Sequence, residues 1–246
     1  LKTLDGGQTW NTTGLQFNNL SQGSSEIFID PTDSNTVWVA TLQGLYKTTN
    51  GGDNWLNIVP GNIVDFRFKP GNSNTLFAVG YDNSDNSKFY KITDGGNTVT
   101  EISTIPNNSN RIILEVTPAN PNMVYVLSAY DNGDGSWQGA NSFQGVYKCT
   151  DAGDTFSRTA ENDDIFRSSQ SWYDMALTVS DTDPNIVFVG VLDIWRSENG
   201  GDDFFQINSW SSRTAAFTHA DIHFMRYFDG VLFTGTDGGI YRSSND

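Results

Sequence analysis

Both histidines of the chain lie in one short segment, His219-Ala-Asp221-Ile-His223. If this segment is a β-strand, the period of two places the side chains of His219, Asp221 and His223 on one face of the sheet. Two imidazoles and a carboxylate are ligands that divalent metal ions accept. The spacing therefore suggests a metal site. The alternative is that the three side chains form hydrogen bonds with neighbouring elements.

Two loops rich in Asp and Asn, 81–87 and 130–136, offer a second kind of metal ligand. In the later loop, Asp131 and Asp134 supply the hard carboxylate oxygens that calcium prefers. Neither loop has the spacing or the terminal Glu of an EF-hand, so solvated turns are the alternative to a calcium site. A divalent metal or calcium is the only cofactor that the sequence suggests.

Carboxylates are also the candidates for catalysis. A glycosidase needs two carboxyl groups roughly 5 to 9.5 Å apart. The candidates for such a pair are Asp65, Asp174 and Asp221. Each falls in or beside a short apolar segment that we expect to be a strand. With 29 acidic residues in the chain, such a pair is easily found by chance, so these residues leave the question of enzymatic activity open.

Four aromatic residues near turns are candidates for ligand contact: Trp137, Trp172, Tyr173 and Trp210. Their rings could stack against sugar rings, although aromatic residues in an all-β protein also fill the spaces between sheets. Trp137 and Trp210 stand among Ser, Gly and Asn, which favours exposure. Trp137 lies in the enlarged interval between two repeats, and we expect this insertion to present a ligand surface.

Composition excludes some classes of partner. The net charge is −15 and the isoelectric point about 4.2, so a phosphate backbone would be repelled and no nucleic-acid partner is expected. No stretch approaches the roughly 20 apolar residues that cross a bilayer, so no membrane insertion is expected. The single cysteine, Cys149, excludes an internal disulfide and is expected to be buried. Any export signal has been removed or lies upstream.

The elements that must position these residues follow from an internal repeat. A Gly-rich box recurs about every 48 residues, at 3–10, 48–55, 92–99, 149–156 and 197–204, and in shortened form at 243–246. Its Asp or Asn can accept hydrogen bonds from nearby backbone N–H groups, and its glycines permit the positive φ of a tight turn. The aromatic residue that follows is expected to pack back over the turn. Box three has Ile92 and Val99 at the Ser/Thr and aromatic positions, so a looser turn is expected there.

A second motif falls between the boxes with the same period, at 27–41, 66–80, 114–128 and 177–191. Each copy is an apolar strand, a turn rich in Pro, Asp and Asn, and a second strand rich in β-branched and aromatic residues. Together with the strands on either side of each box, this gives four strands per repeat. We therefore predict an all-β fold, a β-propeller of about five four-stranded repeats in one segment spanning 1–246.

The box resembles the Asp-box, or bacterial neuraminidase repeat, and Thr3-Leu-Asp5-Gly-Gly7-Gln-Thr9-Trp10 matches its pattern fully. Asp-boxes occur in sialidases, xyloglucan-active glycoside hydrolases, sortilin-type receptors and a photosystem assembly factor. The resemblance implies that the boxes lie at the outer edge of each blade and have a structural role. Sialidases of this family hold the sugar carboxylate with three arginines, and the arginines here show no matched spacing.

The segment from His219 to His223, followed by the strand Asp237-Gly-Gly-Ile-Tyr241, also resembles large secreted Asp-box proteins of gliding and biofilm-forming bacteria. This resemblance implies an extracellular or cell-surface location. Residues 1–5 and 241–245 are equivalent in the repeat, which is compatible with a closed five-bladed ring but favours part of a larger propeller.

We interpret the chain as a module that binds or scaffolds a glycan or a protein. One alternative is a xyloglucanase-like or sialidase-like glycoside hydrolase whose carboxylate site is completed by other parts of the protein. Another is a receptor or assembly factor whose propeller face holds a peptide.

Overall fold

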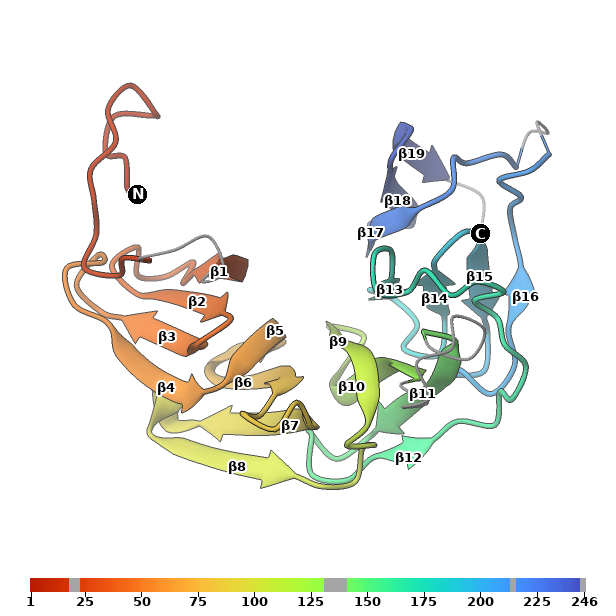
Figure 1. Ribbon diagram of the computed structural model, residues 1–246, viewed down its shortest axis with the longest axis horizontal. Helices are drawn as coiled ribbons and strands as arrows, with labels where there is room; N and C mark the ends of the chain where they lie inside the picture. Colours follow the sequence, from red (N-terminus) through yellow and green to blue (C-terminus); the bar gives the residue numbers. More distant parts are fainter. Residues whose placement is uncertain (18–22, 131–140, 213–215, 244–246) are drawn as a thin grey trace.

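The computed structural model describes residues 1–17, 23–130, 141–212 and 216–243, and it contains five antiparallel sheets arranged in an open arc (Figure 1). The sheets follow one another along the chain, as the repeat predicts. Four of them have four strands and the fifth has three in the described part of the chain. The all-β prediction is confirmed. No helix among the described residues is long and apolar enough to cross a membrane.

Each sheet is a simple meander in which consecutive strands are neighbours. The strands of the first two sheets are β1 (Ser24–Ile29), β2 (Val37–Thr41), β3 (Gly44–Thr48), β4 (Leu56–Pro60), β5 (Asn62–Lys69), β6 (Asn72–Tyr81), β7 (Ser87–Thr93) and β8 (Thr98–Ile102). Those of the other three are β9 (Ser109–Thr117), β10 (Asn120–Tyr130), β11 (Phe143–Cys149), β12 (Ser157–Arg158), β13 (Ala176–Val179), β14 (Val187–Gly190), β15 (Ile194–Ser197), β16 (Phe205–Gln206), β17 (Ile222–Phe228), β18 (Val231–Thr236) and β19 (Gly239–Ser243).

The first strand of every sheet lies on the inner side of the arc (Figure 1). Hydrogen bonds join these inner strands across sheet boundaries. The Ser25 hydroxyl donates to the Ile63 carbonyl at 2.9 Å, and the Leu114 N–H donates to Oδ2 of Asp65 at 2.9 Å. Side chains on the inner strands are therefore held in fixed positions relative to one another.

The hydrophobic core is divided into layers between neighbouring sheets. Trp38 and Phe66 belong to the layer between the first and second sheets, and Phe77 and Phe89 to the next. Both faces of the middle sheets are buried, which explains why their central strands are almost continuously apolar. The aromatic residues mainly fill these layers, which is one of the two roles expected for them.

A cross-strand pair of an aromatic and a cation recurs in every sheet. The pairs are Trp38 with Lys47, Phe77 with Lys91, Tyr125 with Lys148, Phe188 with Arg196, and Phe233 with Arg242. The cation also reaches the box turn of the following sheet: Lys47 Nζ lies 5.1 Å from the centre of the Trp38 ring and donates to the Gly95 carbonyl at 2.6 Å. Lys91 likewise contacts Asp154 in the box of the following sheet, so these two lysines connect one sheet to the next.

The box turns have the predicted hydrogen bonds. Oδ1 of Asp5 accepts from the Thr9 N–H at 2.9 Å, and the Trp10 indole donates to the Gly7 carbonyl at 3.1 Å, so the ring packs over the turn. Box three differs, as expected. It forms the short 3₁₀ helix η2 (Asp94–Gly96), which has no side-chain cap hydrogen bond.

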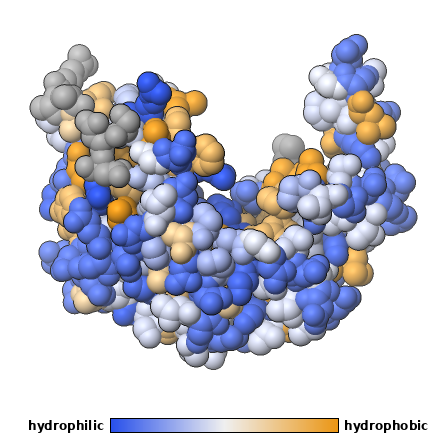
Figure 2. All heavy atoms as spheres, turned by 180° about the vertical axis from the view of Figure 1, so that it is seen from behind, coloured by the Kyte–Doolittle hydropathy of each residue, from blue (hydrophilic) through white to orange (hydrophobic). Residues whose placement is uncertain are grey.

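The arc remains open in the described part of the chain, so the five sheets do not form a closed ring (Figure 1). The space-filling view from behind shows the hollow between the two ends of the arc (Figure 2). The described residues form five sheets, of which the fifth has three strands, and the exact number of repeats stays a prediction.

Candidate functional site

One face of the arc collects side chains from the connection between β12 and β13 and from the fifth sheet, and we call it the mouth. It is the face at which the first strand of each sheet begins and at which the second strand turns into the third. The connection from β12 to β13, residues 159–175, crosses the mouth. Six side chains near its end form the mouth cluster: Gln170, Tyr173, Asp174, Asp221, His223 and Asp237.

The connection is fixed in place before it reaches the cluster. Ile165 and Phe166 are buried in the layer between the third and fourth sheets. The Ser171 hydroxyl donates to the Asn141 carbonyl at 2.5 Å, and Arg111 donates to the Ser171 carbonyl at 2.9 Å. These contacts hold the turn that precedes β13 and leave the next two aromatic side chains facing solvent.

The second part of the cluster comes from the start of β17. Asp221 has φ of 62°, a left-handed conformation that Asp tolerates better than most residues, and the Ile222 N–H donates to the Val191 carbonyl at 2.8 Å. The pairing of β17 with β18 shifts between Ile222 and Phe224, so His223 lies in a β-bulge. Bulges commonly redirect a side chain beside a functional site.

The third part is the tight turn between β18 and β19. Thr236 pairs with Gly239, which leaves Asp237 and Gly238 as the turn. A Cβ atom at position 238 would lie 2.5 Å from the His219 side chain, so glycine allows the two elements to approach. This approach brings Asp237 beside the bulge.

Hydrogen bonds connect the three parts. Nε2 of His223 lies 2.7 Å from Oδ1 of Asp237, and the Tyr173 hydroxyl donates to Asp237 at 3.3 Å. Gln170 donates to Oδ1 of Asp221 at 3.1 Å. The hydrogen bond from His223 lowers the pKa of Asp237, so this carboxylate remains ionised.

Asp174 is the buried member of the cluster. Its side chain is completely buried, and neither carboxyl oxygen receives a hydrogen bond from another described residue. Burial, followed by the negative charge of Asp221, raises the pKa of Asp174 to about 7. Asp221 therefore lies near enough for its negative charge to disfavour the ionised form of Asp174.

The three predicted metal ligands do not converge. His219 and Asp221 precede β17 instead of alternating along it, because the strand begins at Ile222. Nδ1 of His219 contacts the Ala220 carbonyl at 3.0 Å, whereas His223 pairs with Asp237. No group of three or more His, Cys, Asp or Glu side chains in the described ranges could hold a metal ion. The expectation that the three side chains share one strand face is wrong.

Other predicted residues lie elsewhere or cannot be placed. Asp131, Asp134 and Trp137 lie outside the described residues, so the calcium and insertion hypotheses stay predictions. Tyr173 belongs to the cluster and Trp172 is its neighbour in the sequence; they have 43% and 57% of their surfaces exposed, and their ring centres are 5.6 Å apart. Trp210 is also exposed, and its backbone N–H donates to Oδ1 of Asp193 at 2.9 Å, outside the mouth cluster.

Asp65 is separated from the other two candidate carboxylates. It lies in β5, is buried, and forms an ion pair with Arg67. Arg67 is also 3.6 Å from Glu115 and 3.9 Å from Glu26, so it joins the inner strands of three sheets. We assign Asp65 a role in joining sheets, whereas Asp174 and Asp221 meet at the mouth.

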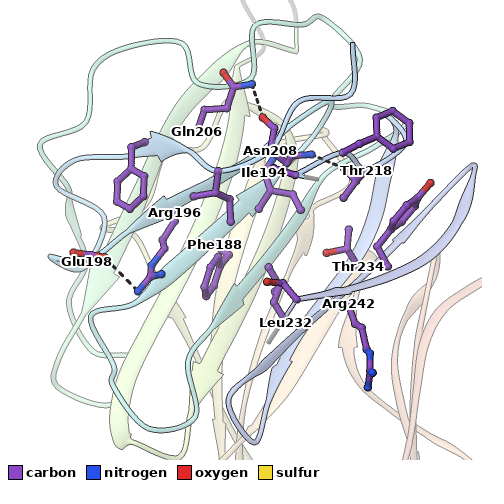
Figure 3. A pocket seen from close by; sticks show the side chains of 16 residues that line it. Phe188, Ile194, Arg196, Glu198, Gln206, Asn208, Thr218, Leu232, Thr234 and Arg242 are labelled. Atoms are coloured by element: carbon purple, nitrogen blue, oxygen red, sulfur yellow. Dashed lines mark hydrogen bonds and ion pairs between the residues drawn. The ribbon is translucent and has the colours of Figure 1, made fainter. Parts of the chain in front are cut away.

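A cavity of about 740 Å³ lies between the fourth and fifth sheets (Figure 3). Its walls include Phe188, Phe205 and Leu232, together with Arg196, which lies 3.3 Å from Glu198. The cavity extends to the outer part of the fourth sheet, where the fifth sheet contributes no described fourth strand. Its lining holds no pair of acids and none of the mouth cluster, so the cavity is separate from the candidate site.

Sequence reasoning missed Gln170 and Asp237 as site residues. The connection between β12 and β13 runs from residue 159 to residue 175, whereas the corresponding connection between β4 and β5 is the single residue 61. This unusual length was the feature of the sequence that could have indicated a site. The role of Asp237 depends on a bulge in β17, which leaves no pattern in the sequence.

No protein-family model matches the sequence, and no curated protein sequence matches it. Solved structures do match. An ancestral GH74 enzyme has a TM-score of 0.65 at 17% identity, over 91% of this chain and 31% of that chain. The GH74 enzyme of Niastella koreensis has a TM-score of 0.63 at 22% identity, over 89% of this chain and 36% of that chain. YCF48 bound to D1 peptide has a TM-score of 0.59 at 17% identity, over 99% of this chain and 71% of that chain.

These matches, with the five meander sheets, show a fold of the β-propeller type. This chain spans about a third of the length of the two GH74 enzymes. At such identities the similarity establishes the fold and leaves the chemistry to the site.

Proposed function

We propose that this chain is a binding module of a propeller protein and that it holds its ligand at the mouth. The observation that carries the proposal is the convergence of the mouth cluster. Three separate elements bring Tyr173, Asp221 and Asp237 together beside the exposed ring of Trp172. Aromatic surface next to fixed polar groups is the usual composition of a binding site.

The burial of Asp174 favours binding over hydrolysis. Glycosidases keep their two carboxyl groups roughly 5 to 9.5 Å apart so that the sugar, and in some cases a water molecule, fits between them. Here Asp174 has no exposed surface with which to touch a substrate. The hydrolase alternative is supported only by the similarity of the fold to GH74 enzymes.

The finer assignments are also proposals. The hydrogen bonds of the box turns support membership of the Asp-box repeat family. The open arc and the length of the GH74 enzymes support a larger propeller. We propose an extracellular or cell-surface location on the sequence resemblance alone, and cell fractionation would test it.

The experiment is to incubate the chain with a panel of neutral, acidic and amino oligosaccharides and of basic and neutral peptides. Calorimetry would measure binding, and a reducing-end assay would measure cleavage. We expect one class to bind, with the affinity reduced in Trp172→Ala, and no reducing ends to be released. Release that is abolished in Asp221→Asn would instead establish a hydrolase.

A further inference from the structure

We propose that Asp221 and Asp237 bind the guanidinium or ammonium group of a basic side chain on a protein ligand. This inference rests on the proposed function and specifies its ligand. Charge at the mouth is unbalanced, because one cluster contains the carboxyl groups of Asp174, Asp221 and Asp237.

Only one of these carboxyl groups, that of Asp237, is paired with a cationic or basic side chain. Arg111 uses its guanidinium to donate to the Ser171 carbonyl, and the ion-pair contact of His223 goes to Asp237. Asp221 receives a hydrogen bond from the neutral amide of Gln170. Asp174 is completely buried and receives none from another described residue. An unpaired buried carboxylate is unfavourable, and an added cation would stabilise Asp174 and Asp221 in their ionised forms together.

The neighbouring aromatic rings suit a long basic side chain. Trp172 and Tyr173 are exposed beside the carboxylates, with their planes inclined at 48°. A cation is attracted to an aromatic face, and the apolar stem of Lys or Arg packs along such rings while its charged group remains polar. The two rings and the acids therefore match both parts of one basic side chain.

The same rings are less suited to a sugar. Stacking of a pyranose needs an open, flat aromatic face, but the Trp172 and Tyr173 planes are tilted and the Tyr173 ring meets His223 at 87°, with ring centres 4.7 Å apart. The net charge of −15 also favours association with a basic partner surface. These observations favour a protein ligand over a glycan.

The affinity for a cation beside Asp174 should depend on pH. The titratable or charged side chains that act on or near Asp174 are Arg111, Tyr173, Asp221, His223 and Asp237. A bound cation favours the ionised form of Asp174, so binding should expel the proton that this group holds in the free protein. Affinity should therefore increase as the pH rises from about 6 to about 8.

The test uses three peptides that differ only at one position, with Arg, Lys or the neutral isostere citrulline in a capped Gly-Ser sequence. Binding to the chain is measured by NMR titration. We expect the Arg peptide to bind at least tenfold more tightly than the citrulline peptide at pH 8. Asp221→Asn and Asp237→Asn should abolish this preference, and Asp174→Asn should remove most of its pH dependence.

Asp33→Asn is the matched control, because it removes one negative charge from the β1–β2 turn of the first sheet, on the face opposite the mouth. Equal binding of the Arg and citrulline peptides would overturn the inference, as would an equal loss in Asp33→Asn. Chitosan and cellulose oligosaccharides are tested in parallel. If one binds in a manner that depends on Trp172 while the Arg peptide does not bind, the basic-side-chain inference fails and the proposed binding function stands.

Discussion

The ammonium group of Lys47 lies over the Trp38 ring in its own sheet and donates a hydrogen bond to the Gly95 carbonyl in the next sheet. Lys2 makes the corresponding contact with the Gly51 carbonyl at 3.0 Å, and Lys91 contacts Asp154 in the following box at 2.7 Å. At Lys2, Lys47 and Lys91, the basic residue three positions before the box anchor therefore contacts the following box. This contact explains why a cation recurs at this position.

Lys47→Met should weaken the joint between the first two sheets. The substitution keeps the apolar stem and removes the charged hydrogen bond and the cation–π contact, which together contribute about 1 to 3 kcal/mol. We expect a decrease of this size in the free energy of unfolding, measured in urea. Lys69→Met is the control, because the exposed hydrogen bond of Lys69 to Asn122 joins side chains only. Equal effects of the two substitutions would contradict the role of Lys47.

Asp174→Asn should stabilise the protein, and more so at high pH. The pKa of Asp174 is raised from its ordinary value of 3.8 to about 7, so between these values the folded state holds a proton that the unfolded state has lost. The free energy of unfolding therefore falls as the pH rises through this window, by at most about 1.4 kcal/mol per pH unit. The variant lacks this penalty. We expect a gain of about 1 to 3 kcal/mol at pH 8 and a much smaller one at pH 4.

Asp33→Asn gives the opposite trend and serves as the comparison. Hydrogen bonds from Thr36 and Asn35 lower the pKa of Asp33, so its contribution to stability is present above its ordinary pKa and is lost as the pH falls. Urea unfolding would show the two signs if Asp174→Asn is compared at pH 4 and pH 8, and Asp33→Asn at pH 4 and about pH 2, below the ordinary pKa of Asp33. The same pH trend in both variants would mean that Asp174 is not protonated in the folded state.

The sequence predicted the fold well because the repeat is a local pattern. Each box combines an Asp or Asn, glycines and an aromatic residue within eight positions, and the turn it forms, such as that of Asp5, needs no distant contact. The strands between boxes were equally visible, because their turns are rich in Pro, Asp and Asn. The recurrent joint made by Lys47 was not predicted, because it depends on how sheets are placed against each other.

The site was only partly predictable for the same reason. Asp174 and Asp221 were candidates, yet their proximity depends on the path of the connection between β12 and β13. The alternation expected from His219 to His223 failed because β17 begins at Ile222 and carries a bulge at His223. Asp237 became relevant only when a tight turn brought it beside that bulge.

Gly238→Ala should disturb the mouth without affecting the rest of the fold. The added Cβ would lie 2.5 Å from the His219 side chain, so either the ring or the β18–β19 turn must shift. Overpacking of this kind typically costs about 1 to 3 kcal/mol. We expect the hydrogen bond between His223 and Asp237 to be lost, visible as a changed NMR chemical shift of the His223 ring. Gly23→Ala, just before β1, adds a Cβ that meets nothing within 4 Å and controls for the loss of a glycine.

Cys149→Ser should preserve box four, whereas Cys149→Ala should weaken it. Cys149 occupies the position that Thr3, Thr48 and Ser197 hold in other boxes, and its Sγ is 2.9 Å from both Oδ1 of Asp151 and the Gly153 N–H. A serine hydroxyl is a stronger donor than a thiol and can make both hydrogen bonds, but alanine can make neither. We expect Cys149→Ala to lower the free energy of unfolding by about 1 to 3 kcal/mol, since it leaves a buried N–H without a partner. Cys149→Ser should remain within about 1 kcal/mol of the parent, and an equal loss in both variants would show that the thiol acts through packing alone.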